Sequence, residues 1–499
     1  MTGNTGKKAS FGNLLLLSVL GALVIWYLWI GIMAAAVPVR SQLPPMPEPH
    51  FGDRILVFAP HEDDETLGAA IYMRRAIAAG ARVYVCLMTA GEGEELGAAF
   101  ATRTPLPSPS TFVRLGHIRQ RESIAALARI GLPKSHIIFL NYPCLGLTQL
   151  WSASNWSYDQ LWTSRFTRTD HSPFDGGLTA NAPFCGASVL RDVETVLQEV
   201  RPTHVVTLHP SDVHPDHWPT YGFAKLALED LRARTKASWL RDCQVYTYLV
   251  HYPRWPVPWG YYPDLPLMPP AQIINLPINH WLSLPESNDD VAIKNRMILT
   301  YRSQMARYDM LLRAFARRTE IFAKLDDISL TRLDLASQAV FMEPTGESRY
   351  LSEHPSVDIA EVGLWSDGES LQIHVKTAAP QTPRGMLQVV LHIVNPAPDT
   401  PKAIQIRYRT GQPATVTSVA DDRGPTPIPA LANCAITDEN TTIITLPYGD
   451  IGNGRMLMVD VMAGQTRYDH SMTRTVLLPP RGYETNVYNK EQSTPTVNE

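Results

Sequence analysis

The sequence is poor in cysteine and has little net charge. Its 499 residues include five cysteines, and no two of them are spaced as a CxxC pair. A zinc site built from thiolates therefore has no support. The formal net charge is −4 and no stripe of basic residues stands out, so we expect no nucleic-acid partner.

Because the number of cysteines is odd, at least one thiol has no partner within the chain. Cys86 lies in the apolar run 82–88, where it is expected to behave as a small buried hydrophobic residue. Cys144 and Cys185 bracket a loop-rich insert. A disulfide between these two is the pairing that we consider for an oxidising compartment.

One long segment near the N-terminus lacks charge altogether. No charged residue occurs from Leu14 to Val37, and a helix of that length would reach about 36 Å, more than the roughly 30 Å of a hydrocarbon core. We expect residues 14–37 to be an uncleaved transmembrane signal anchor. The small residues Ala34 to Ala36 resemble a cleavage site, so a cleaved signal peptide is the alternative.

The charges beside this segment predict its orientation. Lys7 and Lys8 precede it and only Arg40 follows closely, a bias that would keep residues 1–13 in the cytoplasm. The folded body would then be extracytoplasmic, either periplasmic or at the cell surface. A cytosol-facing body is the alternative, because two lysines make a small charge difference.

The rest of the chain is long enough for two folded domains. A Pro-rich linker over 38–49 is expected to hold the body away from the bilayer. We expect a catalytic domain over 50–330, a β-sandwich accessory domain over 340–480 and a disordered tail over 481–499.

Apolar runs and helical patterns alternate after residue 53, which predicts a Rossmann-like α/β fold with a mostly parallel sheet and helices on both faces. The expected strands are 54–59, 82–88, 136–140, 203–208 and 244–250. The expected helices lie near 65–79, 117–130, 187–200, 218–233 and 287–322, with a loop over 90–97.

From about residue 340 the pattern changes to short runs of period two, which indicate an antiparallel β-sandwich. These runs are 371–375, 387–393, 404–408, 442–446 and 456–461. The sandwich either caps the first domain or binds carbohydrate, and both interpretations stay open.

An insert over 141–186 interrupts the alternation and is rich in aromatic residues. It contains Trp151, Trp156, Phe166 and Phe174. These side chains either form a wall on which sugar rings stack or pack under the loop as a small core of their own.

Two groups of His and acidic residues follow two of the expected strands. The first, His61-Glu62-Asp63-Asp64-Glu65, comes directly after strand 54–59. The second follows strand 203–208 and consists of His209, Asp212, His214, Asp216 and His217. In open α/β sheets, ligands bind outside the carboxyl ends of the strands, so both groups can contribute to one mononuclear metal site.

A hydrolytic metal site needs imidazole and carboxylate ligands, a water and a separate base. We expect His61, Asp64 and His217 to bind the ion and Asp63 to face its water. His214, protonated, would stabilise an oxyanion and give its proton to the leaving nitrogen.

Either group alone would have a plainer interpretation, as a capping His or a first-turn acid on a helix. Their pairing at equivalent strand ends favours the metal. Glu65 is expected in the first helical turn or behind the ligands, and Asp216 is expected to orient an imidazole.

These motifs resemble those of a known family. Pro60-His61-Glu62-Asp63-Asp64-Glu65 is similar to the (A/P)HPDDE motif of the PIG-L/LmbE-like N-acetylglucosaminyl deacetylases, and the segment 214–217 is similar to their HPDH motif. Weaker matches are 89–92, Arg119 with Glu122, and 301–304.

The resemblance, which covers roughly residues 50–325, implies a Rossmann-like fold and a divalent ion, usually zinc. It implies removal of the N-acetyl group from N-acetylglucosamine attached to a lipid, a thiol precursor or another aglycone. By position, it implies the same ligands, base and acid as above. Arg119 and Glu122 match a family position near substrate, although a surface ion pair is the plainer interpretation. His251, after another strand, either reaches the site mouth or caps the strand end.

The sequence departs from the family pattern in two places. Glu62 replaces the usual proline, and it either tunes the base or faces solvent. Cys144 lies in Pro143-Cys144-Leu145-Gly146, where many relatives have an acid that contacts sugar hydroxyls. The first departure should leave the ligands in place, whereas the second affects which sugar is bound.

The sequence therefore predicts a membrane-anchored, zinc-dependent deacetylase of N-acetylglucosamine-type units in an envelope glycan or glycolipid, acting by metal-bound water attack on the acetamide. The membrane is contacted through the N-terminal helix, and the oligomeric state is not predicted. One alternative is another metal-dependent amide or ester hydrolase, such as a thiol-conjugate amidase or an O-deacetylase. Another is a catalytically silent, membrane-tethered glycan-binding protein.

Overall fold

The computed structural model describes Gly21, residues 43–330 and most of residues 337–478. The described segments of the last part are 337–346, 355–366, 370–381, 386–395, 401–409, 412, 414–420, 426–427, 433–447, 451, 454–464 and 468–478. The predicted anchor 14–37, apart from Gly21, and the predicted tails 1–13 and 481–499 lie outside the described residues. Within the described part of the chain, no helix is both long enough and apolar enough to cross a membrane.

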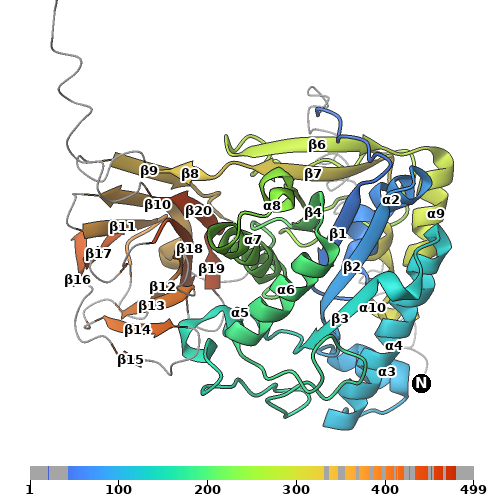
Figure 1. The fold of residues 1–499 in the computed structure, drawn as a ribbon, viewed down its shortest axis with the longest axis horizontal. Helices are drawn as coiled ribbons and strands as arrows, with labels where there is room; N and C mark the ends of the chain where they lie inside the picture. The colour runs from blue at the N-terminus through green and yellow to red at the C-terminus, as the bar shows by residue number, and fades with distance from the viewer. Residues whose placement is uncertain are drawn as a thin grey trace, which may run out of the picture.

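The first part of the chain forms a seven-stranded sheet in the order β3-β2-β1-β4-β5-β7-β6 (Figure 1). Its strands are β1 (Arg54–Ala59), β2 (Arg82–Thr89), β3 (Ile137–Tyr142), β4 (His204–Leu208), β5 (Gln244–Tyr248), β6 (Asn279–Pro285) and β7 (Thr319–Leu325). Strands β1 to β5 pair in parallel, whereas β7 is antiparallel to both β5 and β6. The order reverses between β1 and β4, which is where ligands bind in such sheets.

Helices cover both faces of this sheet. The helices are α2 (Asp64–Ala78), α3 (Glu95–Thr102), α4 (Pro109–Leu127), α5 (Leu147–Trp151), α6 (Gly186–Val200), α7 (His217–Arg234), α8 (Ser238–Asp242), α9 (Asn288–Ile298) and α10 (Arg302–Arg313). One core packs Ile55 and Val57 of β1 against α2, α4, α9 and α10, and a second packs Leu56 and Phe58 against α6 and α7. Because β1 is buried on both faces, its sequence is a continuous apolar run. The predicted Rossmann-like α/β fold is confirmed.

The C-terminal part is the predicted antiparallel sandwich. Its strands are β8 (Ile328–Ser329), β9 (Ser337–Met342), β10 (Ile359–Ser366), β11 (Ser370–Thr377), β12 (Met386–Val394), β13 (Lys402–Arg409), β14 (Thr415–Ala420), β15 (Thr426–Pro427), β16 (Asn433–Asp438), β17 (Thr441–Pro447), β18 (Met456–Gly464), β19 (Tyr468–His470) and β20 (Arg474–Leu477). One sheet has the order β16-β17-β11-β10-β9, and the other has the order β15-β14-β13-β12-β18-β20-β8 with β19 beside β18.

The sandwich shares a core with the α/β part. Alternate residues of β12 and β18, including Val389 and Val459, fill the space between the two sandwich sheets. The residues between them, including Val390 and Met458, belong to the core that contains α6 and α7. In Figure 1, α7 lies between the sandwich on the left and the parallel sheet on the right. The two predicted domains are therefore joined through an apolar interface.

The predicted helix 287–322 is wrong in its last third. The chain forms α9 and α10, which are separated by a break at 299–301, and residues 319–325 form strand β7. Strand β7 pairs with β6, which the sequence pattern did not indicate. Sheet pairing with a distant partner overrides local periodicity here.

Two other boundaries differ from those predicted. Helix α4 begins at Pro109, not near residue 117, and Ser108 with Thr111 forms a capping box at its start. Helix α3 begins within the predicted loop 90–97, where the Glu94 side chain accepts a hydrogen bond from the amide of Gly97. Both starts carry local capping signals, Ser-Pro and Glu, that periodicity alone overlooks.

The insert over 141–186 packs mainly as a core. Trp151 and Trp156 are fully buried and Phe174 nearly so, which rules out sugar stacking for these three. The disulfide considered for an oxidising compartment is absent, because Cys144 and Cys185 are buried thiols that are not joined to each other.

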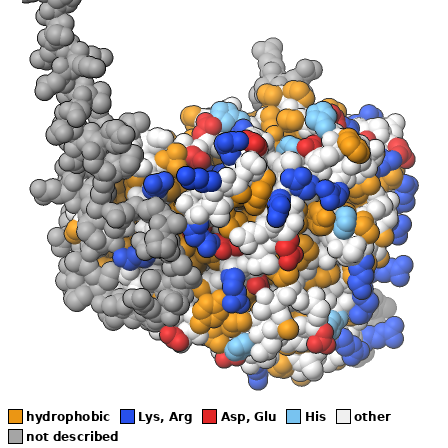
Figure 2. All heavy atoms as spheres, viewed as in Figure 1, with side chains coloured by type: hydrophobic (Ala, Val, Ile, Leu, Met, Phe, Trp, Pro, Cys, Tyr) orange, Lys and Arg blue, Asp and Glu red, His pale blue; other side chains and the backbone are white. Residues whose placement is uncertain are grey.

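The surface in the same view has mixed charge. Figure 2 shows Lys and Arg side chains dispersed among acidic, apolar and other polar atoms.

A buried charge network holds α2, the helix that begins at the first motif. Helix α2 is kinked at Ala69. The amides of Ile71 and Tyr72, just after the kink, donate to the two carboxylate oxygens of Glu320, each over 2.9 Å. Lys294 Nζ lies 2.8 Å from the same carboxylate and is fully buried. Glu320 of β7 thus replaces the helical carbonyls lost at the kink.

We predict that Glu320→Ala lowers the free energy of unfolding by about 3–5 kcal/mol, because it leaves a buried ammonium without its close partner and two amides without acceptors. Urea unfolding followed by tryptophan fluorescence measures the loss. Glu320→Gln, which keeps one acceptor oxygen, should lose less. A loss below about 1 kcal/mol for the alanine variant would contradict this account of the kink.

Candidate metal centre and its pocket

The two predicted groups lie together at the carboxyl ends of β1 and β4. His61, Asp63 and Asp64 follow β1, and His214 and His217 follow β4. Because β1 and β4 are neighbours at the reversal of strand order, these loops face each other. All of these side chains are buried or nearly so, and His61, Asp63, Asp64 and His214 line a cavity of about 560 Å³.

Three atoms that can donate electron pairs form a small triangle at the bottom of this cavity. His61 Nδ1 lies 3.1 Å from Asp64 Oδ2 and 3.3 Å from His217 Nε2. His217 Nε2 lies 3.2 Å from Asp64 Oδ2. Ligand atoms at about 2.0–2.1 Å from a tetrahedral zinc ion would lie about 3.3 Å apart. The triangle therefore has the size of one face of such a site.

Carboxylates hold the outer nitrogen of each imidazole. Asp216 Oδ2 lies 3.0 Å from His61 Nε2, and Asp212 Oδ2 lies 3.1 Å from His217 Nδ1. A neutral imidazole that donates its N–H to the carboxylate on that side turns the lone pair of its opposite nitrogen toward Asp64. Carboxylate–histidine pairs of this kind orient metal ligands and fix their tautomer.

The donor set fits a divalent cation. Two imidazole lone pairs and a carboxylate oxygen converge, an arrangement that is unfavourable unless a positive charge lies between them. Burial disfavours the charged forms of these groups. Without a cation, Asp212 and Asp64 nevertheless raise the His217 pKa to about 9, and the protonated imidazoles of His217 and His61 hold the Asp64 pKa well below its usual value. Ligand atoms lie close enough to hold an ion in two overlapping groups. One consists of His61, His214 and His217, and the other of Asp64, His217 and His251.

Asp63 lies beside the triangle in an unusual backbone conformation. Its φ of 145° lies in the range that favours glycine, and such residues cost about 1–3 kcal/mol and are typical of active sites. Its amide donates to Glu65 Oε2 over 3.0 Å. Burial raises the Asp63 pKa to about 7, against the attraction of Arg119, whose Nη2 lies 3.3 Å away.

Glu65 is fully buried and braces the loop from behind. Its Oε1 accepts hydrogen bonds from Ser123 Oγ over 2.7 Å and from Tyr301 Oη over 2.8 Å. Its Oε2 holds the amide of Asp63. Glu65 thus lies in the first turn of α2, as expected, and fixes the backbone that carries the candidate base.

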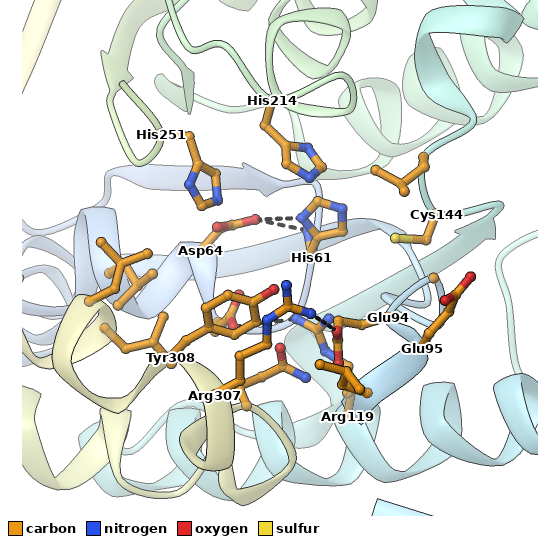
Figure 3. A pocket seen from close by; sticks show the side chains of 18 of the residues that line it. His61, Asp64, Glu94, Glu95, Arg119, Cys144, His214, His251, Arg307 and Tyr308 are labelled. Carbon is orange, nitrogen blue, oxygen red and sulfur yellow. Dashed lines mark hydrogen bonds and ion pairs between the residues drawn. The ribbon is translucent and has the colours of Figure 1, made fainter. Parts of the chain in front are cut away.

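His214 points into the cavity as a neutral hydrogen-bond donor (Figure 3). Its Nδ1 accepts the Asp216 amide over 3.2 Å, so the ring proton lies on Nε2. Burial and the neighbouring imidazoles of His217 and His61 hold the His214 pKa well below its usual value. This differs from the protonated imidazole expected from the sequence.

His251 lies beside His214 at the same side of the cavity (Figure 3). Its amide donates to Asp212 Oδ2 over 2.8 Å, which ties the end of β5 to the loop after β4. Burial and the nearby His217 lower the His251 pKa to about 4. Of the two interpretations of His251, the structure therefore favours the one in which it reaches the site.

Comparison with known families covers the part of the chain that carries this site. Residues 56–228 match the PIG-L family model, described as GlcNAc-PI de-N-acetylase. Residues 56–228 form a PIG-L domain. Members of this family are deacetylases, which supports hydrolysis of an amide. The match spans less than half of the chain, and a comparison with curated proteins gives no match.

Solved structures resemble about half of this chain, at low identity. A deacetylase of teicoplanin biosynthesis, solved with teicoplanin, is 18% identical, with 55% of this chain and 100% of that chain covered and a TM-score of 0.35. N,N'-diacetylchitobiose deacetylase from Pyrococcus horikoshii is 16% identical, covering 54% and 83%, with a TM-score of 0.32. A 4-carboxy-2-hydroxymuconate hydratase from Pseudomonas putida is 15% identical, covering 52% and 82%, with a TM-score of 0.30. At these values the matches do not bear on the reaction.

Glu62, which replaces the usual proline of the PIG-L motif, does not face solvent. It is fully buried, and its Oε2 lies 3.6 Å from Arg119 Nε. Burial raises the Glu62 pKa to about 8, although Arg119 opposes the shift. The Arg119 guanidinium also donates to the carbonyls of Gly91 and Glu62, each over 2.9 Å. Arg119 thus lies between the carboxylates of Glu62 and Asp63.

Glu122 is placed outside the cavity of the PIG-L domain. Both of its oxygens accept hydrogen bonds from Ser303, from the amide over 2.9 Å and from Oγ over 2.6 Å. It therefore ties α4 to the start of α10. Neither of its two interpretations, a substrate contact or a surface pair with Arg119, describes this arrangement.

Cys144 lines the cavity beside His61. Its amide donates to Glu92 Oε1 over 3.0 Å, and burial raises the pKa of the thiol. Burial also raises the Glu92 pKa to about 7. Glu92, which follows β2, therefore lies near the position at which the PIG-L pattern usually has an acid. Its Oε1, however, already accepts the hydrogen bond from the Cys144 amide.

The cavity mouth was not predicted as a unit. Helix α10 contributes Gln304, Arg307, Tyr308, Leu311 and Leu312, which recur at helical spacing, and α3 contributes Leu96 on the other side. Arg307 Nη1 pairs with Glu94 Oε1 over 2.5 Å across this mouth (Figure 3). The sequence signal that could have identified this mouth is Gln304 in the motif 301–304, because the other α10 residues of the mouth follow it one and two helical turns later.

We predict that Asp212→Asn weakens binding of the divalent ion by about 10–100-fold, because an amide cannot accept all the hydrogen bonds that orient His217 and its neighbours. Chelator competition on the purified chain measures the affinity. The matched substitution Asp192→Asn removes a buried carboxylate that contacts Tyr142 and Thr179 instead. If both variants lose the same affinity for the ion, the effect comes from general destabilisation of the fold.

Proposed function

We propose that this protein is a membrane-anchored, metal-dependent N-deacetylase of N-acetylglucosamine-type units in an envelope glycan or glycolipid. The observation that carries the proposal is the triangle of His61, Asp64 and His217 with Asp63 beside it, within a PIG-L domain. The coarser statement, a deacetylase-family fold, is already established by the family match.

We assign His61, Asp64 and His217 as the ligands of a divalent ion, with zinc as the first choice. Two neutral imidazoles and a carboxylate are a usual set for catalytic zinc, which keeps a further position open. Such an ion lowers the pKa of a water and polarises the amide carbonyl. Asp212 and Asp216 keep both imidazoles in the tautomer that this role needs.

Asp63 is the proposed general base. It lines the cavity beside the ligands, and its pKa of about 7 is close to the operating pH that favours a base. Arg119 Nη2 lies 3.3 Å away and fixes the carboxylate without covering it from the cavity. The Asp63 carboxylate takes the proton of the attacking water.

His214 is the proposed electrostatic group. Its Nε2–H faces the cavity because Nδ1 accepts the Asp216 amide. A fixed donor aimed at the developing oxyanion is worth about 2.7–4 kcal/mol in comparable sites. The proton for the leaving nitrogen then comes from Asp63, which has received one from the water.

The mouth of the cavity supports a substrate with an extended aglycone. Leu96 lines the cavity and is 49% exposed, and Phe100, one turn further along α3, is 65% exposed. Arg165 lies at the same cavity. An apolar strip that continues outward from a sugar-sized cavity suits a lipid or other apolar group attached to the sugar.

We predict that Asp63→Asn lowers acetate release by about 10²–10⁴-fold while the bound metal is retained, because the amide cannot take a proton. The substrates are N-acetylglucosamine conjugates with a lipid or a soluble aglycone, and O-acetyl and thiol conjugates complete the panel. Metal content by elemental analysis is the control. Equal release by both proteins would remove Asp63 from its role, and preference for an O-acetyl ester would replace the proposed reaction.

We further propose that residues 14–37 anchor the chain and that the PIG-L domain is extracytoplasmic, supported by the uncharged run and by Lys7 and Lys8 before it. A reporter fused after Glu499 tests the side of the membrane. Alkaline phosphatase should be active in this position and a cytosolic fluorescent reporter dark. The reverse result would place the domain in the cytosol and leave the chemistry unaffected.

A further inference from the structure

The β-sandwich carries one buried acid in the strand that faces the PIG-L domain. Asp460 lies in β18 among residues that are buried on both sides of the sheet, and it is fully buried itself. Its neighbours on the same face, Met458 and Met462, pack against the α/β core. A carboxylate in such a place is costly unless every oxygen is hydrogen-bonded.

Three donors converge on Asp460. Trp151 Nε1 donates to its Oδ2 over 2.7 Å. His470 Nε2 lies 3.3 Å from its Oδ1, and Thr473 Oγ1 donates to the same oxygen. Trp151 belongs to the α/β part, whereas the other two belong to the sandwich. Asp460 therefore links the two parts by a buried hydrogen bond, one of several polar contacts across the interface.

The first route from Asp460 to the metal centre runs through α5. Trp151, at the end of α5, is held by Asp460 and also accepts a hydrogen bond at its carbonyl from His392 Nε2 over 3.0 Å. At the other end of α5, the amides of Leu145 and Leu147 donate to Asp216 over 2.6 and 3.0 Å. Asp216 in turn holds Nε2 of the candidate ligand His61. Because α5 is a single short helix, fixing its end fixes its start.

The second route runs through α7. His470, which Asp460 holds, stacks on Trp218 with ring centroids 3.9 Å apart and an interplanar angle of 19°. Trp218 directly follows the candidate ligand His217 at the start of α7. The loop before it is also supported by the sandwich, since Ser211 Oγ donates to Met472 Sδ over 3.0 Å. The same carboxylate thus reaches the elements behind both imidazole ligands.

We propose that Asp460 is a positioning residue for the metal centre and that the β-sandwich acts as a structural part of the active site. This inference rests on the proposed function, because it needs His61 and His217 to be ligands. Asp460 touches neither metal nor substrate. It aligns α5, whose start holds Asp216 against His61, and the start of α7, which carries His217, so that the two imidazoles keep the separation that the ion needs.

Asp460→Asn tests the inference in the full-length chain purified in detergent. The variant keeps the volume but turns one carboxylate oxygen into an NH2 donor, so either Trp151 loses its acceptor or His470 and Thr473 must change from donors to acceptors. We expect zinc affinity, measured by chelator competition, to fall about tenfold, the lower end of the range for groups that orient ligands directly. Activity at saturating zinc should recover.

The matched control is Asp469→Asn, in the neighbouring strand β19. Asp469 is also a buried carboxylate, but it accepts the amide of Ile359 within the sandwich. We expect its zinc affinity to equal that of the wild type. Trp151→Phe removes the donor while leaving an aromatic ring, and it should lower zinc affinity in the same direction as Asp460→Asn even if the latter folds poorly.

The outcomes separate the inference from the proposed function. If the wild type binds zinc and releases acetate, and Asp460→Asn and Trp151→Phe both bind zinc as the wild type does, the positioning role is overturned and the proposed function stands. If Asp469→Asn loses as much affinity as Asp460→Asn, the effect is general to the sandwich and the specific role is overturned. A wild type that binds no divalent ion would overturn both.

Discussion

The structure depends on one electrostatic constraint, the convergence of two imidazole lone pairs and one carboxylate oxygen at His61, Asp64 and His217. When both imidazoles are neutral and donate their outer N–H groups to Asp216 and Asp212, the inner nitrogens present lone pairs. A cation relieves the repulsion among the three atoms. Because the three residues come from two loops, this relief is available only when β1 and β4 lie side by side, as they do at the reversal of strand order.

The need to hold these three ligand atoms in place explains why several charged groups are buried around the site. Arg119 is the buried cation that faces Glu62 and Asp63. The two oxygens of Glu65 accept hydrogen bonds from a backbone amide, a serine and a tyrosine, so neither buried oxygen lacks a donor. Burying any of these charged groups without a partner would cost free energy of folding, and each is stabilised by a partner from a different element. The loops are consequently held from several sides, which a site with strict ligand geometry requires.

The sequence predicted what local patterns encode and missed what distant partners decide. Strand β1 and the two motifs were recognisable because a doubly buried strand is a continuous apolar run and a ligand group follows it at once. The first residues of β7, 319–322, were included in the predicted helix because the pairing of β7 with β6 has no local signal. The burial of Glu62 was equally hidden, since it depends on Arg119 from α4. The period-two pattern predicted the strands of the sandwich. It did not predict that β12 and β18 are buried on their second face as well, because that depends on the packing of α6 and α7 there.

Gly91 shows why the exchange of proline for Glu62 is tolerated in this PIG-L domain. The residue has a φ of +58°, and a Cβ added to it would lie 2.4 Å from Glu62 Oε2 and 2.7 Å from Arg119 Cζ. Any side chain at this position would displace the two groups that meet there. The space that receives the Glu62 carboxylate is therefore made by a glycine at the end of β2, not by the loop that contains Glu62. The three residues form one unit, in which the Glu62 carboxyl group meets Arg119, and the triangle of His61, Asp64 and His217 is present beside it.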